Sequence, residues 1–279
     1  MALDKLKPEA VLAFGPIKEH LEVVEVAAPL GIHIMVEKPL AANLEDALKM
    51  QQLANKYKVM LLTNYETSWY PSTAESFRLV KDSNFVGQIR KVVFHHGHQG
   101  PKEIGVGDEF FKWLTDPVLN GGGALMDFGC YGANLSTWLL DGMRPLSVTA
   151  ITQQLNPADN PKVDDEATII LTYPNSQTII EASWNWPIGR KDMEIYGLTG
   201  AIFSDNAKQL RIRTAKGYDG FDEEKSGRAE TDVQIPEHSR IFCKKSLHYI
   251  GFTQSGLLHG KTYVLAWEAH FQQGSNDTA

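Results

Sequence analysis

Short apolar runs and helical segments alternate in the first 65 residues, and this alternation restricts the fold more than any other feature of the sequence. The runs 10–14, 32–36 and 59–63 are typical of buried strands. Between them, residues 18–30 and 43–58 have the spacing of amphipathic helices. Strands that alternate with helices form a parallel sheet with right-handed crossovers. The sequence therefore predicts a parallel three-stranded sheet in this region.

Polar residues and prolines follow each of these strands. The three strand ends are Gly15-Pro16, Glu37-Lys38-Pro39 and Asn64-Tyr65. In open parallel sheets, ligands bind beyond the carboxyl ends of the strands, so these stretches are expected to line one edge. Lys38 precedes a proline, which favours an extended backbone and a directed side chain. On these residues alone, a polar strand exit without a function is an equally good interpretation.

The pattern changes after residue 88, where strand-like runs follow one another across short turns. The runs are 88–99, 145–155, 166–174, 177–186, 191–197 and 201–205. Short turns between such runs favour antiparallel pairing. We therefore expect the parallel sheet to be followed by a larger, mostly antiparallel sheet.

Composition excludes several classes of protein. The formal net charge of the 279 residues is -7 and no basic run is present, which argues against a nucleic-acid surface. No apolar segment is long enough to span a membrane. The two cysteines, Cys130 and Cys243, form no CxxC pattern, which favours a reducing compartment. We expect a soluble cytoplasmic protein.

Histidines at positions 95, 96 and 98 are the strongest candidates for metal ligands. On a strand His96 and His98 would share a face, but no cysteine or carboxylate lies nearby in the sequence to complete a ligand set. We favour a structural or substrate-lining role and predict no metal site. The motifs of serine hydrolases, zinc proteases, P-loop proteins and calcium sensors do not occur in the sequence.

The stretch GGGALMDFGCYGANL, residues 121–135, places Asp127 and Tyr131 four residues apart, on one face of a predicted helix. Taken alone, it suits an ordinary helix start with a core aromatic residue. Together with Lys38, this stretch suggests an acid–base site, because a cation beside a phenol stabilises phenolate and makes tyrosine a usable acid or base. Such a set moves the proton when a hydroxyl and a carbonyl interconvert. The reaction also needs a hydride carrier.

Three segments give the sequence a specific resemblance. HIMVEKPLA (33–41), GGGALMDFGCYGANL (121–135) and VDDEATIILTYPNSQTIIEASW (163–184) resemble, in order and spacing, the Gfo/Idh/MocA family. These are NAD(P)-dependent oxidoreductases that act mostly on sugars, inositols and related polyols. The resemblance implies an α/β protein in which a partial Rossmann-type parallel sheet precedes an α+β domain with a large, mostly antiparallel open sheet.

The resemblance also implies roles for individual residues. Lys38 matches the lysine of the family's EKP motif, and Asp127 matches its helix aspartate. Many members carry histidine where this chain has Tyr131, so it resembles the glucose–fructose oxidoreductase and dihydrodiol dehydrogenase branch, whose tyrosine exchanges the proton. The catalytic residues expected are Lys38, Asp127 and Tyr131. The residues expected along NAD or NADP are Pro16, His20, Glu37, Lys38 and Asn64.

The resemblance divides the chain into three parts. Residues 1–66 would be the C-terminal part of a Rossmann-like domain, 67–250 the substrate and oligomerisation domain, and 251–279 an atypical tail. The expected function is hydride transfer to or from a sugar or polyol. A homo-oligomer formed through the open sheet is the expected assembly.

Two departures from the family leave alternatives open. The sequence contains no GxGxxG turn and resembles the family from about the fourth strand of the Rossmann sheet onwards, so about half of that domain is expected to be missing. Residues 239–273 do not resemble the family's closing segment. One alternative is a truncated, non-catalytic remnant that binds no dinucleotide. Another is an enzyme that a second chain completes.

Overall fold

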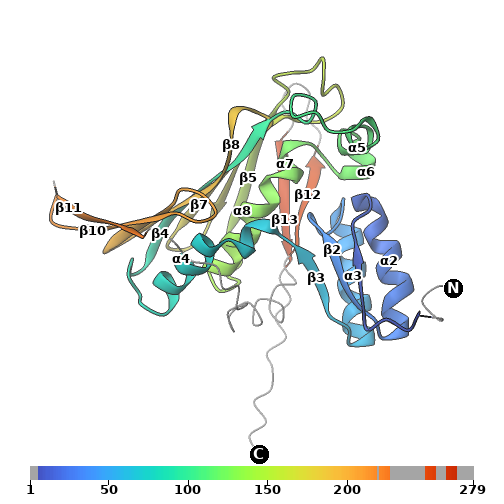
Figure 1. The fold of residues 1–279 in the computed structure, drawn as a ribbon, viewed down its shortest axis with the longest axis horizontal. Coiled ribbons are helices and arrows are strands. Elements are labelled where there is room, and N and C mark those ends of the chain that lie inside the picture. The colour runs from blue at the N-terminus through green and yellow to red at the C-terminus, as the bar shows by residue number, and fades with distance from the viewer. Residues whose placement is uncertain (1–5, 219, 227–248, 256–261, 269–279) are drawn as a thin grey trace, which may run out of the picture.

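The computed structural model describes residues 6–218, 220–226, 249–255 and 262–268. In these residues the chain forms a three-stranded parallel sheet and a separate ten-stranded sheet, each with its own hydrophobic core. Figure 1 shows the smaller unit in blue beside the large sheet. The predicted combination of a parallel sheet with a larger, mostly antiparallel one is confirmed.

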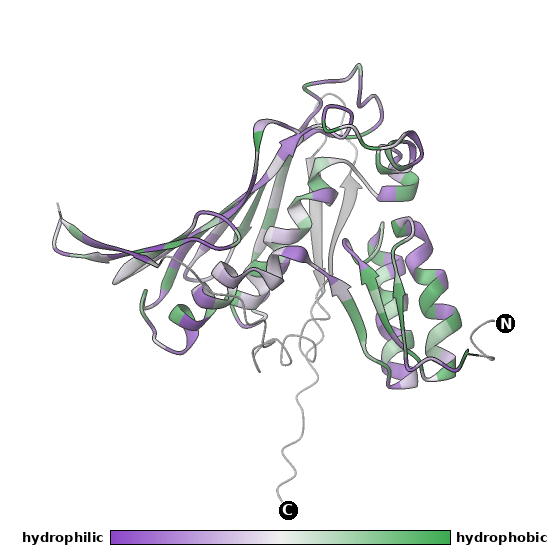
Figure 2. Cartoon of the chain, in the orientation of Figure 1, coloured by the Kyte–Doolittle hydropathy of each residue, from purple (hydrophilic) through white to green (hydrophobic). Residues whose placement is uncertain are grey.

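The small unit is a β-α-β-α-β arrangement. Its elements are β1(Ala10–Ala13), η1(Ile17–Glu19), α2(His20–Ala27), η2(Ala28–Leu30), β2(His33–Glu37), α3(Leu44–Tyr57) and β3(Leu61–Asn64). Asn43 caps α3 by accepting a hydrogen bond from the Asp46 amide at 2.8 Å, as its residue type favours. Val24, Ile34 and Met50 are fully or almost fully buried between the helices and the sheet, and Figure 2 shows the hydrophobic residues of β2 and β3. The polar strand ends lie outside this core.

The large sheet has one parallel pair, β4 with β7, and is otherwise antiparallel. In spatial order its strands are β11(Phe221–Ser226), β10(Leu210–Ala215), β9(Gly200–Ser204), β8(Asn185–Gly197), β4(Ile89–Gln99), β7(Gln177–Ser183), β6(Glu166–Thr172), β5(Ser147–Gln153), β13(Thr262–Glu268) and β12(Tyr249–Ser255). The strand β13 and residues 251–255 of β12 belong to the region expected to be an atypical tail. Most of that tail lies outside the described residues.

Helices of the second unit pack on the large sheet. They are η3(Glu66–Trp69), α4(Pro71–Lys81), α5(Asp108–Leu114), α6(Pro117–Asn120), α7(Ala124–Asp127) and α8(Gly129–Leu139). The helix α8 contacts β4 and β7, and α7 contacts β6 and β7. Phe94, Ile169 and Ile180 are completely buried beneath them. No helix in the described part of the chain is long and apolar enough to cross a bilayer.

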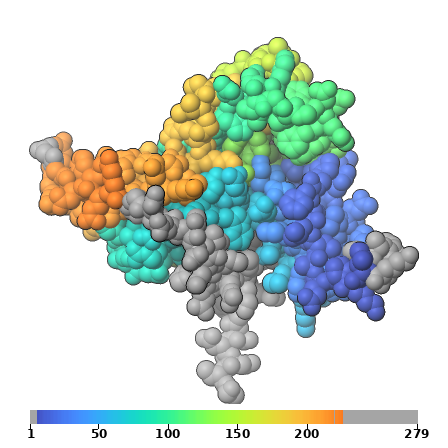
Figure 3. Space-filling view, in the orientation of Figure 1, coloured from blue at the N-terminus to red at the C-terminus, as the bar shows by residue number. Residues whose placement is uncertain are grey.

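The two units touch at the edge where the strands of the small sheet end. The helix α6 contacts η1, and β12 contacts α3. Figure 3 shows the small unit packed beneath the region of α5 and α6, while β10 and β11 extend away from it. The carboxyl ends of β1, β2 and β3 therefore face the helices of the larger unit.

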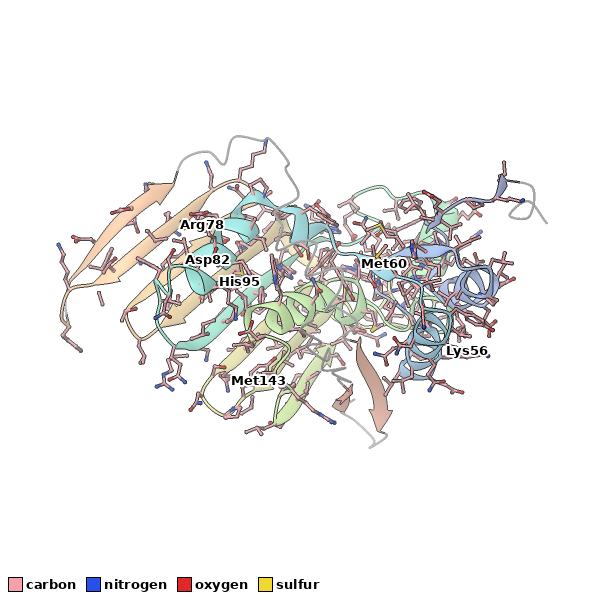
Figure 4. All side chains as sticks on the ribbon, turned by 90° about the horizontal axis from the view of Figure 1, so that it is seen from below. Lys56, Met60, Arg78, Asp82, His95 and Met143 are labelled. Atoms are coloured by element: carbon pink, nitrogen blue, oxygen red, sulfur yellow. The ribbon has the colours of Figure 1, made fainter. Side chains whose placement is uncertain are left out.

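A charged cluster surrounds His95 in the middle of the large sheet, and Figure 4 labels this residue among the side chains of that unit. Its Nδ1 lies 2.7 Å from an oxygen of Glu181 on β7, and its Nε2 lies 3.6 Å from Glu194 on β8. The hydrogen bond to Glu181 raises the pKa of His95 above its ordinary 6.5. The same bond lowers the pKa of Glu181 below its ordinary 4.5.

These opposite pKa shifts predict a window of maximum stabilisation. The raised pKa of His95 contributes stability that is present below pH 6.5 and is lost as pH rises through its folded-state pKa. The lowered pKa of Glu181 contributes stability that is present above pH 4.5 and is lost as pH falls through its folded-state pKa. Because Glu181 is more than a third exposed, we expect the pair to contribute about 1 kcal/mol or less to the free energy of unfolding. The free energy of unfolding of the wild type, measured with urea, should therefore be higher at pH 5.5 than at pH 8.5. An equal loss of free energy between these two pH values in His95→Gln would contradict the prediction.

Candidate functional site

Lys38 follows β2 directly, and its side chain reaches from the small sheet to the helices of the large one. Its Nζ forms an ion pair with Asp127 and donates to the backbone carbonyl oxygen of Asp127 at 3.0 Å. The two side chains are only 19% and 13% exposed. The peptide bond between Lys38 and Pro39 is cis. Two motifs that lie 89 residues apart in the sequence thus meet in the fold.

A break in the helix at Phe128 makes the carbonyl of Asp127 accessible to Lys38. The sequence predicts Asp127 and Tyr131 on one helix, but α7 ends at Asp127 and α8 begins two residues later, with Phe128 at φ -107° and ψ -35°. The amide of Tyr131 donates to the carbonyl of Phe128 at 3.2 Å. The expectation of one continuous helix is therefore wrong, and the Asp127 carbonyl accepts from Lys38.

The ion pair is charged near neutral pH. Burial by itself would lower the pKa of Lys38, but the negatively charged forms of the groups around it, Asp127 first among them, together hold that pKa above its ordinary value. Burial by itself would raise the pKa of Asp127, but Lys38 and Trp184 together hold it below its ordinary value. The indole N–H of Trp184 donates to Asp127 Oδ2 at 2.9 Å. Each oxygen of the carboxylate therefore has its own partner.

Tyr131 lies beside two ammonium groups and against another ring. The Nζ atoms of Lys38 and Lys191 are each 5.2 Å from the centroid of its ring. The ring of His96 packs edge-on against it, with 5.7 Å between centroids. Only 3% of Tyr131 is exposed. The structure thus brings together all three residues that the sequence predicts to be catalytic.

The protonation of Tyr131 differs from the expectation. The sequence predicts that Lys38 makes the phenol ionise more readily, but burial raises the pKa of Tyr131 above its ordinary value and Lys38 offsets only part of this rise. The reason is that removing a phenolate from water costs more than one partly compensated ammonium contributes. Tyr131 is therefore a neutral phenol at physiological pH, suited to donating a proton.

Asp164 fixes the helix that carries Asp127. Its carboxylate accepts the amide N–H of Gly123 at 3.0 Å and that of Leu125 at 2.7 Å, which satisfies donors at the start of α7. Asp164 is 6% exposed, and burial raises its pKa. The glycine run is explained by close backbone approaches: a Cβ on Gly121 would lie 2.3 Å from the carbonyl oxygen of Ala42 in the small unit.

Replacing Asp164 by asparagine is expected to lower the free energy of unfolding by about 1–3 kcal/mol, because the amide has one acceptor oxygen for two buried N–H groups. Urea unfolding followed by tryptophan fluorescence measures this. The matched control is Asp116→Asn, since Asp116 caps α6 from a partly exposed position and asparagine caps equally well there. Equal losses of unfolding free energy in the two variants would contradict the role of Asp164 in fixing the start of α7.

The other residues predicted along the cofactor lie at the ends of the three strands. Glu37 accepts a hydrogen bond from Asn64 at 2.6 Å, which joins the ends of β2 and β3. Pro16 precedes η1. His20 is 1% exposed; its Nδ1 lies 3.1 Å from a backbone carbonyl oxygen, and its Nε2 has no partner among the described residues. Glu37 and Asn64 therefore lie together next to Lys38, and contact of all four residues with a cofactor stays a prediction.

The histidines on β4 have different surroundings. His96 is 1% exposed, and burial together with the charge of Lys191 lowers its pKa to about 3. Its neutral ring packs against Tyr131 and Phe94. His98 packs edge-on against Phe128. In the described residues, no group of three or more His, Cys, Asp or Glu side chains could hold a metal ion.

Sequence reasoning missed three residues of the site. The sequence favours a core position for Trp184, which is 2% exposed but also holds Asp127. Lys191 and Glu66 belong to no motif, yet they form an ion pair next to Tyr131. Lys191 lies opposite His96 in the register of β8 and β4. Only this register brings it to the site, and no sequence signal reports it.

Known proteins share both units of this architecture. Residues 1–65 match the family model described as "Oxidoreductase family, NAD-binding Rossmann fold", and residues 77–203 match that of the "GFO/IDH/MocA C-terminal domain". The class that the fold and the site define is thus that of oxidoreductases with a Rossmann-type sheet and a large open-sheet domain. The chain belongs to the Gfo/Idh/MocA family.

Two relatives and one solved structure illustrate the similarity. The D-xylose 1-dehydrogenase [NADP(+)] of Haloarcula marismortui is 32% identical over 168 residues, which are 60% of this chain and 45% of that protein. The trans-1,2-dihydrobenzene-1,2-diol dehydrogenase of Xenopus tropicalis is 29% identical over 166 residues, 59% of this chain and 46% of that protein. The fold resembles that of an inositol dehydrogenase homolog from Azotobacter vinelandii complexed with NAD+, with a TM-score of 0.69 and 21% identity over 80% of this chain and 58% of that one.

The chain spans about half the length of the curated relatives it matches. The comparisons give no support to the non-catalytic remnant: the two relatives described above are both named as dehydrogenases.

Proposed function

We propose that the protein is an NAD(P)-dependent oxidoreductase that transfers a hydride to or from a sugar, polyol or related hydroxyl compound. The observation that carries the proposal is the cluster of Lys38, Asp127 and Tyr131 at the carboxyl ends of parallel strands. Ligands of open α/β sheets bind at this edge. The names of the relatives, a xylose dehydrogenase and a dihydrodiol dehydrogenase, support this class of substrate.

The residues at the strand ends fit the nicotinamide end of such a cofactor. His20 Nε2 is buried without a partner among the described residues, and Glu37 and Asn64 offer paired polar groups beside Lys38. We propose that Pro16, His20, Glu37, Lys38 and Asn64 contact the cofactor. When bound, the cofactor supplies or accepts the hydride, which no side chain can do. Relatives named for NADP(+) and crystallised with NAD+ leave both dinucleotides as candidates.

Tyr131 is the proton donor when a carbonyl is reduced and the acceptor of the proton when a hydroxyl is oxidised. Its neutral phenol donates to the carbonyl oxygen of the substrate as the carbonyl carbon is reduced. Lys38 stabilises the phenolate that forms and orients the substrate oxygen. Asp127, which Trp184 holds by its indole N–H, keeps the ammonium of Lys38 in place.

We also propose a homo-oligomeric assembly and a cytoplasmic location. The large sheet would form a homo-oligomer through the face opposite α8, where Ile151 is 64% exposed. A cytoplasmic enzyme has access to the dinucleotide pool that this reaction needs. The division of the chain at residues 66 and 250 remains a prediction.

Titration of the purified chain with NADH and NADPH tests the proposal, followed by nicotinamide fluorescence and energy transfer from tryptophan. Saturable binding at micromolar cofactor, and turnover of at least one sugar or polyol, are expected. No binding up to millimolar cofactor, with the protein folded, would overturn the proposal for this chain.

A further inference from the structure

Lys191 on β8 is held beside Tyr131 by a separate set of contacts. Its ammonium forms an ion pair with Glu66 of η3, and the same carboxylate accepts a hydrogen bond from the hydroxyl of Tyr70 at 2.6 Å. Lys191 therefore joins the central strands of the large sheet to the segment that follows β3. None of these residues belongs to the Lys38–Asp127 ion pair.

The phenol of Tyr131 is surrounded by titratable groups from six elements or their ends. They are Lys38 after β2, Tyr65 and Glu66 at η3, His96 on β4, Asp127 on α7, Cys130 on α8 and Lys191 on β8. Two of them are neutral near physiological pH: burial lowers the pKa of His96 to about 3 and raises that of Cys130 to about 12. The cations beside the ring are Lys38 and Lys191.

The two cations are compensated to different degrees. The carboxylate of Asp127, which neutralises Lys38, is 13% exposed, whereas that of Glu66, which pairs with Lys191, is 53% exposed. Water screens an exposed charge more strongly than a buried one. The Nζ atoms of both lysines lie 5.2 Å from the centroid of the ring, so Lys191 places a second ammonium group beside Tyr131.

We propose that Lys191 is a second cation of the proton-transfer site and that Glu66 is the positioning residue that keeps its ammonium beside Tyr131. This inference rests on the proposed function. As the carbonyl carbon receives a hydride from the nicotinamide, the C=O π electrons move to the oxygen. That oxygen takes the phenol proton, and a phenolate remains on Tyr131. The charge of Lys191 lowers the energy of this phenolate.

A difluorotyrosine incorporated at position 131 tests the coupling without turnover, because ring fluorines lower the pH at which the phenol ionises. Its absorbance is titrated in four proteins: the parent, Lys191→Met, Lys191→Arg and Lys81→Met. Lys81 is the matched control, since it pairs with Asp141 and lies 5.9 Å from the ring of Phe77, on α4. Thermal unfolding of each protein shows that it is folded.

Lys191→Met is expected to raise the ionisation midpoint by about one pH unit or more, while Lys191→Arg and Lys81→Met leave it nearly unchanged. The Glu66 carboxylate itself raises the pKa of Tyr131, so its positioning role is tested in the double variant: Lys191→Met should raise the midpoint less in Glu66→Gln than in the parent. An unchanged midpoint in folded Lys191→Met, or an equal rise in Lys81→Met, would overturn the inference.

In turnover assays of the natural chain, Lys191→Met should lower kcat for carbonyl reduction about tenfold, and Lys191→Arg should restore most of it. A normal kcat in Lys191→Met would also overturn the inference. A midpoint shift in a protein that turns over no sugar or polyol would instead contradict the proposed function and leave the coupling of Lys191 to Tyr131 intact.

Discussion

Replacing Tyr131 by phenylalanine is expected to lower kcat for carbonyl reduction by about 10²–10⁴-fold, the contribution typical of a positioned acid–base group. Phenylalanine keeps the ring that packs against His96 and Phe128, so the fold should persist. The cofactor should bind as before, because only the phenolic oxygen is removed. Turnover is measured from NAD(P)H absorbance, and binding from nicotinamide fluorescence.

Tyr173→Phe is the matched control for this prediction. Tyr173 is as buried as Tyr131, at 3% exposure, and its hydroxyl has no partner among the described residues. Its removal should leave kcat unchanged and should not destabilise the fold, since no hydrogen bond is lost. If Tyr131→Phe kept most of its kcat while NADH still bound, the proton would come from another group, and Tyr131 would be a packing residue.

Local patterns are sufficient to predict the small unit. Helical spacing, the cap at Asn43 and the glycine at position 31 depend only on neighbouring residues, and the structure has α3 at Leu44–Tyr57 and Gly31 at φ 74°. The same locality explains why the strand ends could be expected to converge on one edge. Parallel order follows from the alternation of strands and helices.

The site depends on contacts between distant residues, and this limits what a sequence can show. Lys38 and Asp127 could be proposed as partners because both belong to motifs. The contact of Lys191 with Tyr131 depends on the pairing of β8 with β4, and strand register is not encoded in a local pattern. The break at Phe128 follows from no local pattern either, and the Asp127 carbonyl beside it accepts from Lys38 at the end of another sheet.

Replacing Gly123 by alanine is expected to lower the free energy of unfolding by about 3 kcal/mol or more, through overpacking against a rigid backbone. A Cβ at this position would lie 1.8 Å from the carbonyl oxygen of Asp164, and that oxygen already accepts the amide of Ala124 at 3.1 Å. The carbonyl of Asp164 and the amide of Ala124 both belong to the backbone, so neither can move aside as the end of a flexible side chain would. Urea unfolding followed by tryptophan fluorescence measures the loss.

Gly107→Ala provides the control, since a Cβ there would meet no atom within 4 Å and its backbone has φ -63°. It should be neutral or slightly stabilising. Comparable stability of both variants would show that the turn before α7 shifts freely.

If the turn does not shift, Gly123→Ala displaces α7, and Asp127 with it, so activity and stability fall together. Tyr131→Phe is expected to lower activity without lowering stability, because it removes one oxygen and leaves the turn intact. The two variants thus distinguish the group that moves the proton from the backbone that positions it.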